Sequence, residues 1–273
     1  MALGELYEPS GQALDTARAV LEVERPYANS IAVGCTNRCT YCYGRKKYAG
    51  SEAIRFPDKP PVEMVKSQIR KKGAKAERLV RSLNEGTGVF ISFMTDPLLE
   101  ENKKATMDLY HYITNHFTNT RIAVLTKCGY PSSFFHPLQE SKWLHENVRL
   151  GVTVVSSYKI FRDRYEPNAP LPEVRIRTLQ ELHKLGYFTF LSFEPDPSPV
   201  QFEHDPIKDV LFPLKDSLDL VVYGKWNYDK GCESVTALRY YRQQVPRVTA
   251  FCEKQGIRLY VKEGTKDFIA RGR

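Results

Sequence analysis

The sequence lacks the features that direct a protein into or across a membrane. Its first residues, MALGELYEPSGQALD, do not show the basic-then-apolar pattern of a secretory signal. None of its apolar runs approaches the roughly 20 residues that a membrane span needs. Low-complexity tracts and internal repeats are also absent. We therefore expect a cytoplasmic globular protein without a membrane partner.

The sequence also lacks the cysteine distribution of a disulfide scaffold. A chain of 273 residues can bury enough apolar surface to be stable without disulfides. Three of its six cysteines lie between positions 35 and 42, a spacing that suits metal ligation better than three separate bridges. The others, Cys128, Cys232 and Cys252, are isolated, and most isolated cysteines are buried thiols.

Acidic residues are fewer than basic ones, 32 against 40, which gives a formal charge of +8. Much of the excess lies between Lys59 and Arg81. Such a run is usually a solvated helical surface. The excess is also compatible with a nucleic acid or another anionic partner.

Short apolar runs alternate with helical patterns along the chain. We expect strands at 31–33, 89–93, 121–126, 148–155, 187–193, 219–223 and 257–261. We expect helices at 12–24, 61–84 with a break at Gly73, 100–117, 132–141, 171–186 with Gly186 as a left-handed C-cap, and 235–255 with an interruption at Pro246. About seven βα units with continuous apolar strands predict a parallel sheet, as a barrel or partial barrel. A doubly wound open sheet is the alternative.

Polar or reactive residues follow nearly every expected strand. They are the three cysteines, Thr95–Asp96, Thr126–Lys127, Ser156–Ser157, Glu194, Lys225–Asn227 and Lys262–Glu263. Loops are polar in any protein, which accounts for single cases. In a parallel barrel, however, all these strand ends lie on the face where active sites form.

The stretch Ile31–Arg45 (IAVGCTNRCTYCYGR) carries Cys35, Cys39 and Cys42 in the spacing C-x3-C-x2-C. Three thiolates can hold three irons of a 4Fe–4S cluster and leave the fourth iron open. Structural zinc prefers four ligands at short spacings. The nearest histidine is His111, so the spacing favours a cluster over zinc, although a distant residue could complete a zinc site.

With an aromatic residue between the second and third cysteines, this motif resembles the signature of the radical S-adenosylmethionine (SAM) superfamily. Over residues 26–262, the context GC-x3-C-x-Y-C-Y and the later T-D-P, T-K and E-P are similar to the spore photoproduct lyase-like branch. The resemblance implies a partial (β/α)6-type TIM barrel with a C-terminal extra strand. We place this α/β domain at 26–273, after an N-terminal helical extension at 1–25.

The resemblance also implies an activity and the residues that serve it. A 4Fe–4S cluster on the three cysteines would cleave SAM reductively, and the resulting 5′-deoxyadenosyl radical would take a hydrogen atom from substrate. A flavodoxin or ferredoxin would serve as the reductant. The implied cofactor contacts are Tyr41 and Tyr43 beside the cluster or adenine, Thr95 and Asp96 at the methionyl amino group, Lys127 at the carboxylate, and Ser156 and Ser157 at the ribose or carboxylate.

One departure from the family concerns the hydrogen donor. Spore photoproduct lyase carries a hydrogen-donating cysteine just before its equivalent of Thr95–Asp96, whereas the segment Ile91–Met94 has no thiol. The candidate donors in this chain are then Cys128, Cys232 and a tyrosine such as Tyr223.

The substrate is open from sequence alone. Glu194, Lys225 and Trp226 are candidate substrate contacts, and Trp226 could stack on a base or be an ordinary core aromatic. Glu166 and Arg175 could pair with each other or bind cofactor. A nucleic acid or nucleotide, a small metabolite and a protein all remain candidate substrates. The alternatives are a lyase for DNA lesion repair and a nucleic-acid-binding protein with a structural metal site.

Overall fold

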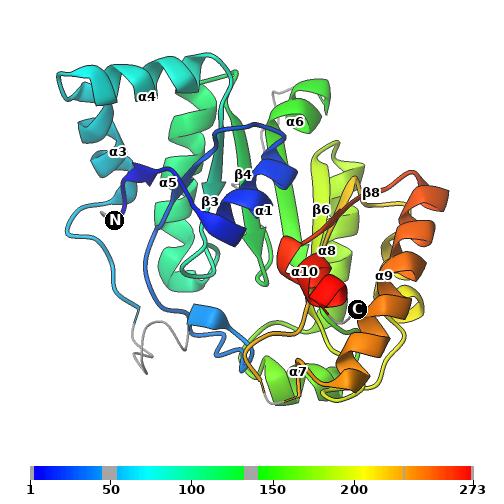
Figure 1. Ribbon diagram of the computed structural model, residues 1–273. Helices are drawn as coiled ribbons and strands as arrows, with labels where there is room; N and C mark the ends of the chain where they lie inside the picture. Colours follow the sequence, from blue (N-terminus) through cyan, green and yellow to red (C-terminus); the bar gives the residue numbers. More distant parts are fainter. Residues whose placement is uncertain (1–2, 45–53, 132–140, 230, 272–273) are drawn as a thin grey trace.

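The computed structural model describes residues 3–44, 54–131, 141–229 and 231–271, and it contains one eight-stranded sheet (Figure 1). The strands are β1 (Leu6–Tyr7), β2 (Tyr27–Asn29), β3 (Gly88–Ile91), β4 (Arg121–Thr126), β5 (Val148–Thr153), β6 (Phe188–Asp196), β7 (Leu220–Lys225) and β8 (Arg258–Val261). They pair in chain order, β1 antiparallel to β2 and every later pair parallel. Because β1 and β8 are the two edges, the sheet is an open, partial barrel. The predicted fold class is confirmed.

Helices connect successive strands, as parallel pairing requires. They are α1 (Gly11–Leu21), α3 (Pro61–Arg70), α4 (Ala74–Asn84), α5 (Glu100–His116), α6 (Ser141–Asn147), α7 (Lys159–Tyr165), α8 (Pro172–Lys184) and α9 (Val235–Gln255), and α10 (Glu263–Arg271) follows the last strand. A π-helical turn (Ile207–Leu211) and a 3-10 turn (Phe212–Leu214) precede β7. No helix in these described ranges is long and apolar enough to cross a membrane.

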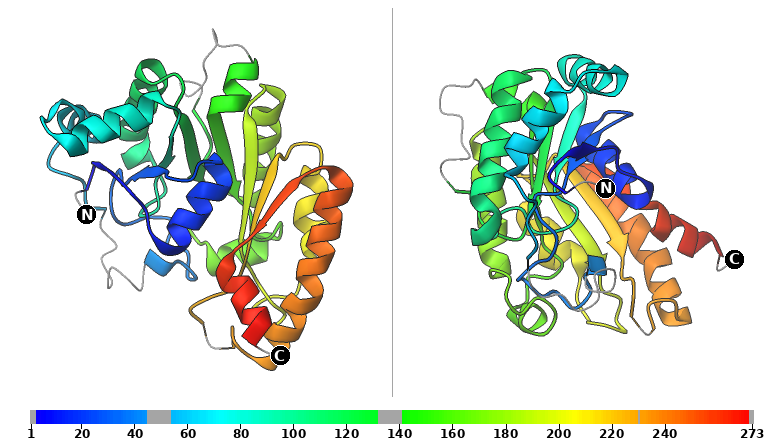
Figure 2. Two further views of the ribbon diagram at one scale, coloured as in Figure 1. Left: turned by 45° about the horizontal axis from the view of Figure 1, so that its top comes forward. Right: turned by 90° about the vertical axis from the view of Figure 1, so that its left-hand side faces the viewer.

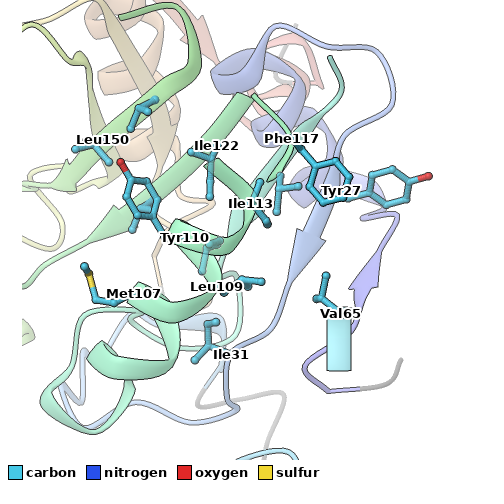
Figure 3. Packing of buried hydrophobic residues seen from close by; sticks show 14 of the residues in the cluster. Tyr27, Ile31, Val65, Met107, Leu109, Tyr110, Ile113, Phe117, Ile122 and Leu150 are labelled. Atoms are coloured by element: carbon cyan, nitrogen blue, oxygen red, sulfur yellow. The ribbon is translucent and has the colours of Figure 1, made fainter. Parts of the chain in front are cut away.

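The two faces of the sheet carry different cores, because side chains alternate along each strand. Ile122 of β4 packs in a cluster with Ile113 and Tyr110 of α5 (Figure 3). Val124 belongs to the same cluster. Ala123, between them, belongs to a second cluster on the other face, which includes residues of α1. Figure 2 shows α1 lying on the opposite side of the sheet from α5 and α8. Residues of α5, α6, α8 and α9 therefore cover the convex face, and α1 covers the concave face.

Several expected boundaries hold. Gly73 separates α3 from α4, with a φ of 119° that suits glycine. Gly186 follows α8 with a φ of 86°, as predicted for a left-handed cap. Strand β4 has the predicted bounds. The helix expected at 132–141 falls almost wholly outside the described residues.

Two expectations were wrong. The first parallel strand lies at Tyr27–Asn29, upstream of the apolar run 31–33. Ile31 and Ala32 are buried as loop residues, and Val33 makes only an isolated bridge with Arg55, so this run is apolar because it packs and not because it joins the ladder. The helix of 235–255 continues through Pro246, and residues after the proline pack into the core beside β7.

The basic run lies on α3 and α4. Part of its charge is neutralised by ion pairs to the N-terminal segment, Lys71 with Glu5 at 3.1 Å and Arg78 with Glu8 at 2.6 Å. Helix α4 leads directly into β3, so it lies at the end of the sheet opposite the cysteines (Figure 1). The division of the chain at residue 25 stays a prediction; β1 pairs with β2, and α1 packs on the sheet.

Candidate active site

The cysteine loop, residues 34–44, lies beyond the carboxyl end of β2; the last residue of the predicted stretch, Arg45, is outside the described residues. Its first residue, Gly34, is hydrogen-bonded to the residues that follow β3. The Gly34 amide donates to the Met94 carbonyl at 3.2 Å, and the Thr95 hydroxyl donates to the Gly34 carbonyl. The loop is thus fixed to the strand end that carries Thr95 and Asp96.

The three thiols share this loop but differ in environment. Cys35 accepts from the backbone amides of Asn37 and Asp96, and burial, followed by the Asp96 charge, raises the pKa of its thiol. Burial raises the pKa of Cys39 to about 12, while the positive charge of Lys127 acts in the opposite direction. Cys42 is half-buried.

These thiols fit a three-thiolate cluster through their chemistry and surroundings. In the described ranges, no three His, Cys, Asp or Glu side chains converge at metal-binding distances. The Cys39 thiol nevertheless interacts with both Cys35 and Cys42, and two amides already donate to Cys35. Amide donors and a nearby cation are the surroundings that stabilise cysteine sulfur in iron–sulfur sites. Cys35, Cys39 and Cys42 are the residues that would hold the cluster.

The Asp96 carboxylate lies at the centre of the hydrogen-bond network of the site. Its Oδ1 accepts from the Thr126 hydroxyl at 2.5 Å and the Leu98 amide at 3.1 Å. Its Oδ2 accepts from Asn37 Nδ2 at 3.1 Å and the Lys127 amide at 2.7 Å. One buried carboxylate therefore joins the ends of β3 and β4 to the cysteine loop.

Lys127 and Tyr41 lie together beside the loop. The Lys127 Nζ is 5.5 Å from the centre of the Tyr41 ring. Burial opposes the charge of Lys127, but Cys39 and Glu166 raise its pKa overall. The Tyr41 hydroxyl donates to Glu166. Lys127 is thus a cation held next to the predicted cluster position.

Glu166 and Arg175 form an ion pair. This was one of the two arrangements expected for them, the other being contact with a cofactor. Arg175 Nη2 lies 2.6 Å from Glu166 Oε2, and the two side chains are 1% and 2% exposed. Burial works against the charge of Glu166, but Arg175 and Lys127 hold the pKa of this carboxyl below its usual value. The pair stays charged next to Tyr41.

The other predicted cofactor contacts surround the same region. The Tyr43 hydroxyl donates to the Phe93 carbonyl at the end of β3. Ser156 is buried and accepts from the Tyr158 amide at 3.2 Å, and Ser157 is half-buried. Their assignment to SAM stays a prediction.

Trp226, which follows β7, is brought to the cysteine loop. Its ring lies 5.2 Å from the Tyr41 ring and 5.2 Å from the Tyr165 ring, in edge-on geometry. A cavity of about 300 Å³ opens here, between the cysteine loop, the end of α7 and residues 226–229. Cys232 packs against this aromatic cluster.

Cys128, half-buried after β4, is also close to the loop. Side chains of Thr126 and Asn37 hydrogen-bond its thiol, and the thiol interacts with Cys35. Burial, followed by the Asp96 charge, raises its pKa to about 12. The thiol therefore carries its proton at neutral pH.

Two predicted residues are placed elsewhere. Tyr223 points to the convex face, where it packs near α9 and donates its hydroxyl to Asp196. Lys225 is buried, with its Nζ 3.3 Å from the Trp226 carbonyl and 4.7 Å from the centre of the Phe268 ring on α10. Neither is brought to the cysteine loop.

Glu194 lies on the concave face and reaches over Gly224 to Lys262. Each Glu194 carboxylate oxygen is 2.8 Å from the Lys262 Nζ. A Cβ atom at position 224 would lie 2.9 Å from the Glu194 Cγ, so the glycine makes room for this pair. The side chains of Glu194 and Lys262 are 23% and 12% exposed, so both keep some contact with solvent.

Sequence reasoning did not single out Asn37 or Asn168. Asn37 contacts Asp96, and Asn168 Nδ2 donates to the Thr36 carbonyl at 2.8 Å. Asparagines in turn-rich segments are common, and their partners here are far away in sequence. The available signal was the polar character of CTNRC and EPNAP, which does not identify partners.

The comparisons with known proteins concern the family and the fold of the chain. The radical SAM superfamily model matches residues 29–194, and no curated protein matches the sequence. A double mutant of spore photoproduct lyase with bound AdoMet and dinucleoside spore photoproduct has a TM-score of 0.61 at 12% identity, covering 88% of this chain and 76% of that chain. Spore photoproduct lyase complexed with dinucleoside spore photoproduct has a TM-score of 0.59 at 14% identity, covering 86% and 75%.

A third similar structure is Streptococcus suis SuiB bound to the precursor peptide SuiA. Its TM-score is 0.54 at 10% identity, covering 86% of this chain and 48% of that chain. At such identities the likeness of these structures shows the fold. The family match spans more than half of the 273 residues and includes all three cysteines. The chain therefore belongs to the radical SAM superfamily and shares the fold of spore photoproduct lyase.

Proposed function

We propose that this enzyme cleaves SAM reductively at a 4Fe–4S cluster on Cys35, Cys39 and Cys42 and abstracts a hydrogen atom from its substrate. The observation that carries this proposal is the three-thiol loop beside a buried lysine at the carboxyl ends of β2 to β4. The bound cluster and SAM supply the electron transfer and the 5′-deoxyadenosyl radical. The protein binds and orients them and excludes water.

The residues around the cysteine loop offer groups that can bind and orient the cluster and SAM. Lys127 supplies a cation for the carboxylate of SAM, and Ser156 and Ser157 supply polar groups for its ribose or carboxylate. Tyr41 and Tyr43 line the cluster or the adenine. Because the Asp96 carboxylate already accepts four hydrogen bonds, we assign it to holding the site together, and Thr95 beside it to the methionyl amino group.

The proposed activity has a direct test. After anaerobic reconstitution with iron and sulfide, the dithionite-reduced protein should convert SAM to equal amounts of methionine and 5′-deoxyadenosine, measured by liquid chromatography. Omitting dithionite should remove the product, since the reaction needs an electron. A protein that holds four irons per chain and yields no 5′-deoxyadenosine would overturn the proposal.

We propose Cys128 as the residue that returns a hydrogen atom to the substrate radical. Hydrogen-atom donation requires the S–H form, which the raised pKa of about 12 maintains at neutral pH. The Cys128 thiol also interacts with Cys35 and Asn37 of the cysteine loop, whereas Tyr223 packs near α9 and donates its hydroxyl to Asp196. Cys232, packed beside Trp226, is the second candidate.

A nucleotide or nucleic acid is the substrate class that we propose. Dinucleoside spore photoproduct is bound in two of the similar structures, and the Glu194–Lys262 pair offers polar groups inside the barrel. The basic surface of α4 is at the opposite end of the sheet, so it does not support direct contact with a substrate in the site. A cytoplasmic flavodoxin or ferredoxin is the proposed reductant.

The hydrogen donor and the substrate class can be tested together. With dinucleoside spore photoproduct as probe in D2O, the wild type should produce thymidine-containing product that carries deuterium, because a thiol exchanges its proton with solvent. Cys128→Ala should remove most of this incorporation while 5′-deoxyadenosine still forms, because alanine has no S–H to donate. Cys252→Ala, which removes a buried thiol on α9, is the control. Wild-type 5′-deoxyadenosine without probe turnover would reject this substrate, and unchanged deuterium in Cys128→Ala would reject this donor.

A further inference from the structure

The cysteine loop is supported from one side by a single stretch of chain, the supporting segment, residues 165–170. The Thr40 amide donates to the Tyr165 carbonyl at 2.9 Å. Asn168 Nδ2 donates to the Thr36 carbonyl at 2.8 Å. These bonds hold the loop on both sides of Cys39, so the position of the thiols depends on the position of this segment.

A buried charge within the segment makes the third connection. Glu166 accepts a hydrogen bond from the hydroxyl of Tyr41, the residue just before Cys42. With 2% of its side chain exposed, Glu166 has no access to water that could replace this partner. A carboxylate buried to this extent requires charged or hydrogen-bonding partners.

Arg175 supplies the charge that keeps Glu166 ionised, and it also fixes the segment to the sheet. Its Nη1 donates to the Thr153 carbonyl at the end of β5 at 3.1 Å. Its Nε and Nη2 donate to the Pro170 carbonyl at 3.0 and 2.6 Å. The guanidinium therefore connects β5, the supporting segment and, through Glu166, the cysteine loop.

The charge of Glu166 acts on the position where the cluster would bind. Glu166 interacts electrostatically with Cys39, and Lys127 acts on the same thiol with the opposite sign. In a buried site of low effective dielectric, the charge of Glu166 changes the free energy of adding an electron to a metal cluster bound at Cys39. Removing the negative charge should make that centre easier to reduce.

On the basis of the cluster assigned above, we propose that Glu166 is a positioning residue of the reaction. It holds Tyr41, and with it the cysteine loop, in place, and its negative charge makes the bound cluster harder to reduce. Arg175 limits this effect by compensating the charge. If Glu166 and Arg175 only stabilised the turn between α7 and α8, neither the reduction potential nor cluster retention would depend on them.

The test compares Glu166→Gln with the double variant Glu166→Gln/Arg175→Gln. Each protein is reconstituted anaerobically, and the midpoint potential of its cluster is measured by EPR-monitored redox titration. Glu166→Gln should shift the potential to a more positive value, since one negative charge is lost. The double variant loses one charge of each sign, so its potential should return toward that of the wild type. Equal potentials in the wild type and Glu166→Gln would overturn the proposal.

Tyr41→Phe tests the positioning role of Glu166 separately from the effect of its charge. It removes the hydroxyl that binds Glu166 but leaves both charges, so the potential should change less than in Glu166→Gln. Release of iron to a chelator should nevertheless become about 10-fold faster, the lower end of what loss of a supporting contact costs a metal site. In the metal-free protein, the Thr40 amide should exchange its hydrogen faster. Wild-type iron release from Tyr41→Phe would overturn the positioning role.

Glu22→Gln is the matched control. Glu22 pairs with Arg149 at 2.8 Å, and Arg149 is 4% exposed, but this pair lies at the start of β5, at the opposite end of the strand from Thr153. Its loss should alter neither the potential nor iron release. A wild type that binds no cluster would overturn the proposed function, whereas a wild type with a normal cluster and an unaffected Glu166→Gln would overturn only the role of Glu166.

Discussion

A Cys39→Ser variant is expected to fold and to lose its cluster and its SAM cleavage. Cys39 is 6% exposed and lies between the two other thiols of the loop, so the cluster would lose one of its three protein ligands. Loss of an outer contact already costs a metal site roughly 10–100-fold in affinity or activity. We expect 5′-deoxyadenosine formation to fall by more than that, together with the broad visible absorption of the iron–sulfur cluster.

Cys252→Ser is the control for this result. Cys252 is also buried, and burial raises its pKa to about 12, but it packs on α9 in the convex core. Serine at position 252 should lower stability modestly and leave the iron content unchanged. Iron content and 5′-deoxyadenosine formation equal to the wild type in Cys39→Ser would contradict the assignment of the loop.

The fold was predictable because its signal is local. Runs such as 121–126 are apolar on both faces, as strands covered on both sides must be, and glycines such as Gly186 mark helix ends through their own backbone conformation. The cysteine spacing is also local. The misplaced first strand shows the limit, since Ile31 and Ala32 are as buried as strand residues without belonging to the sheet.

The side-chain partners of the site were mostly not predictable, because they are set by pairing between distant segments. Tyr41 and Glu166 are 125 residues apart in the chain, and Glu194 and Lys262 are 68 apart. The alternation of strand residues also decides which strand-end groups face inward. In the sequence, Lys225 follows an expected apolar strand just as Glu194 does, but in the structure it is buried beside α10 while Glu194 faces the barrel interior.

Asp96→Ala should cause the second large effect, a loss of folding stability centred on the active site. It would leave four donors without their acceptor: the Thr126 hydroxyl, the Asn37 side chain and the amides of Leu98 and Lys127. A buried polar group left unpaired costs roughly 1–3 kcal/mol, and water entering the space of the carboxylate would offset part of the sum. We expect a loss of about 3–5 kcal/mol in the free energy of unfolding, measured by urea denaturation of the metal-free protein.

Two comparisons separate this role from a general effect of removing an aspartate. Asp216 has a side chain that is 84% exposed, so Asp216→Ala should change stability by no more than about 0.5 kcal/mol. Asp96→Asn keeps one acceptor oxygen but turns an amide group toward two donors. Its loss of folding stability should therefore be intermediate. Because Asp96 also holds Asn37 within the cysteine loop, the iron content after reconstitution should fall in the same order as stability. An Asp96→Ala protein as stable as Asp216→Ala would show that this carboxylate does not join the loop to the sheet.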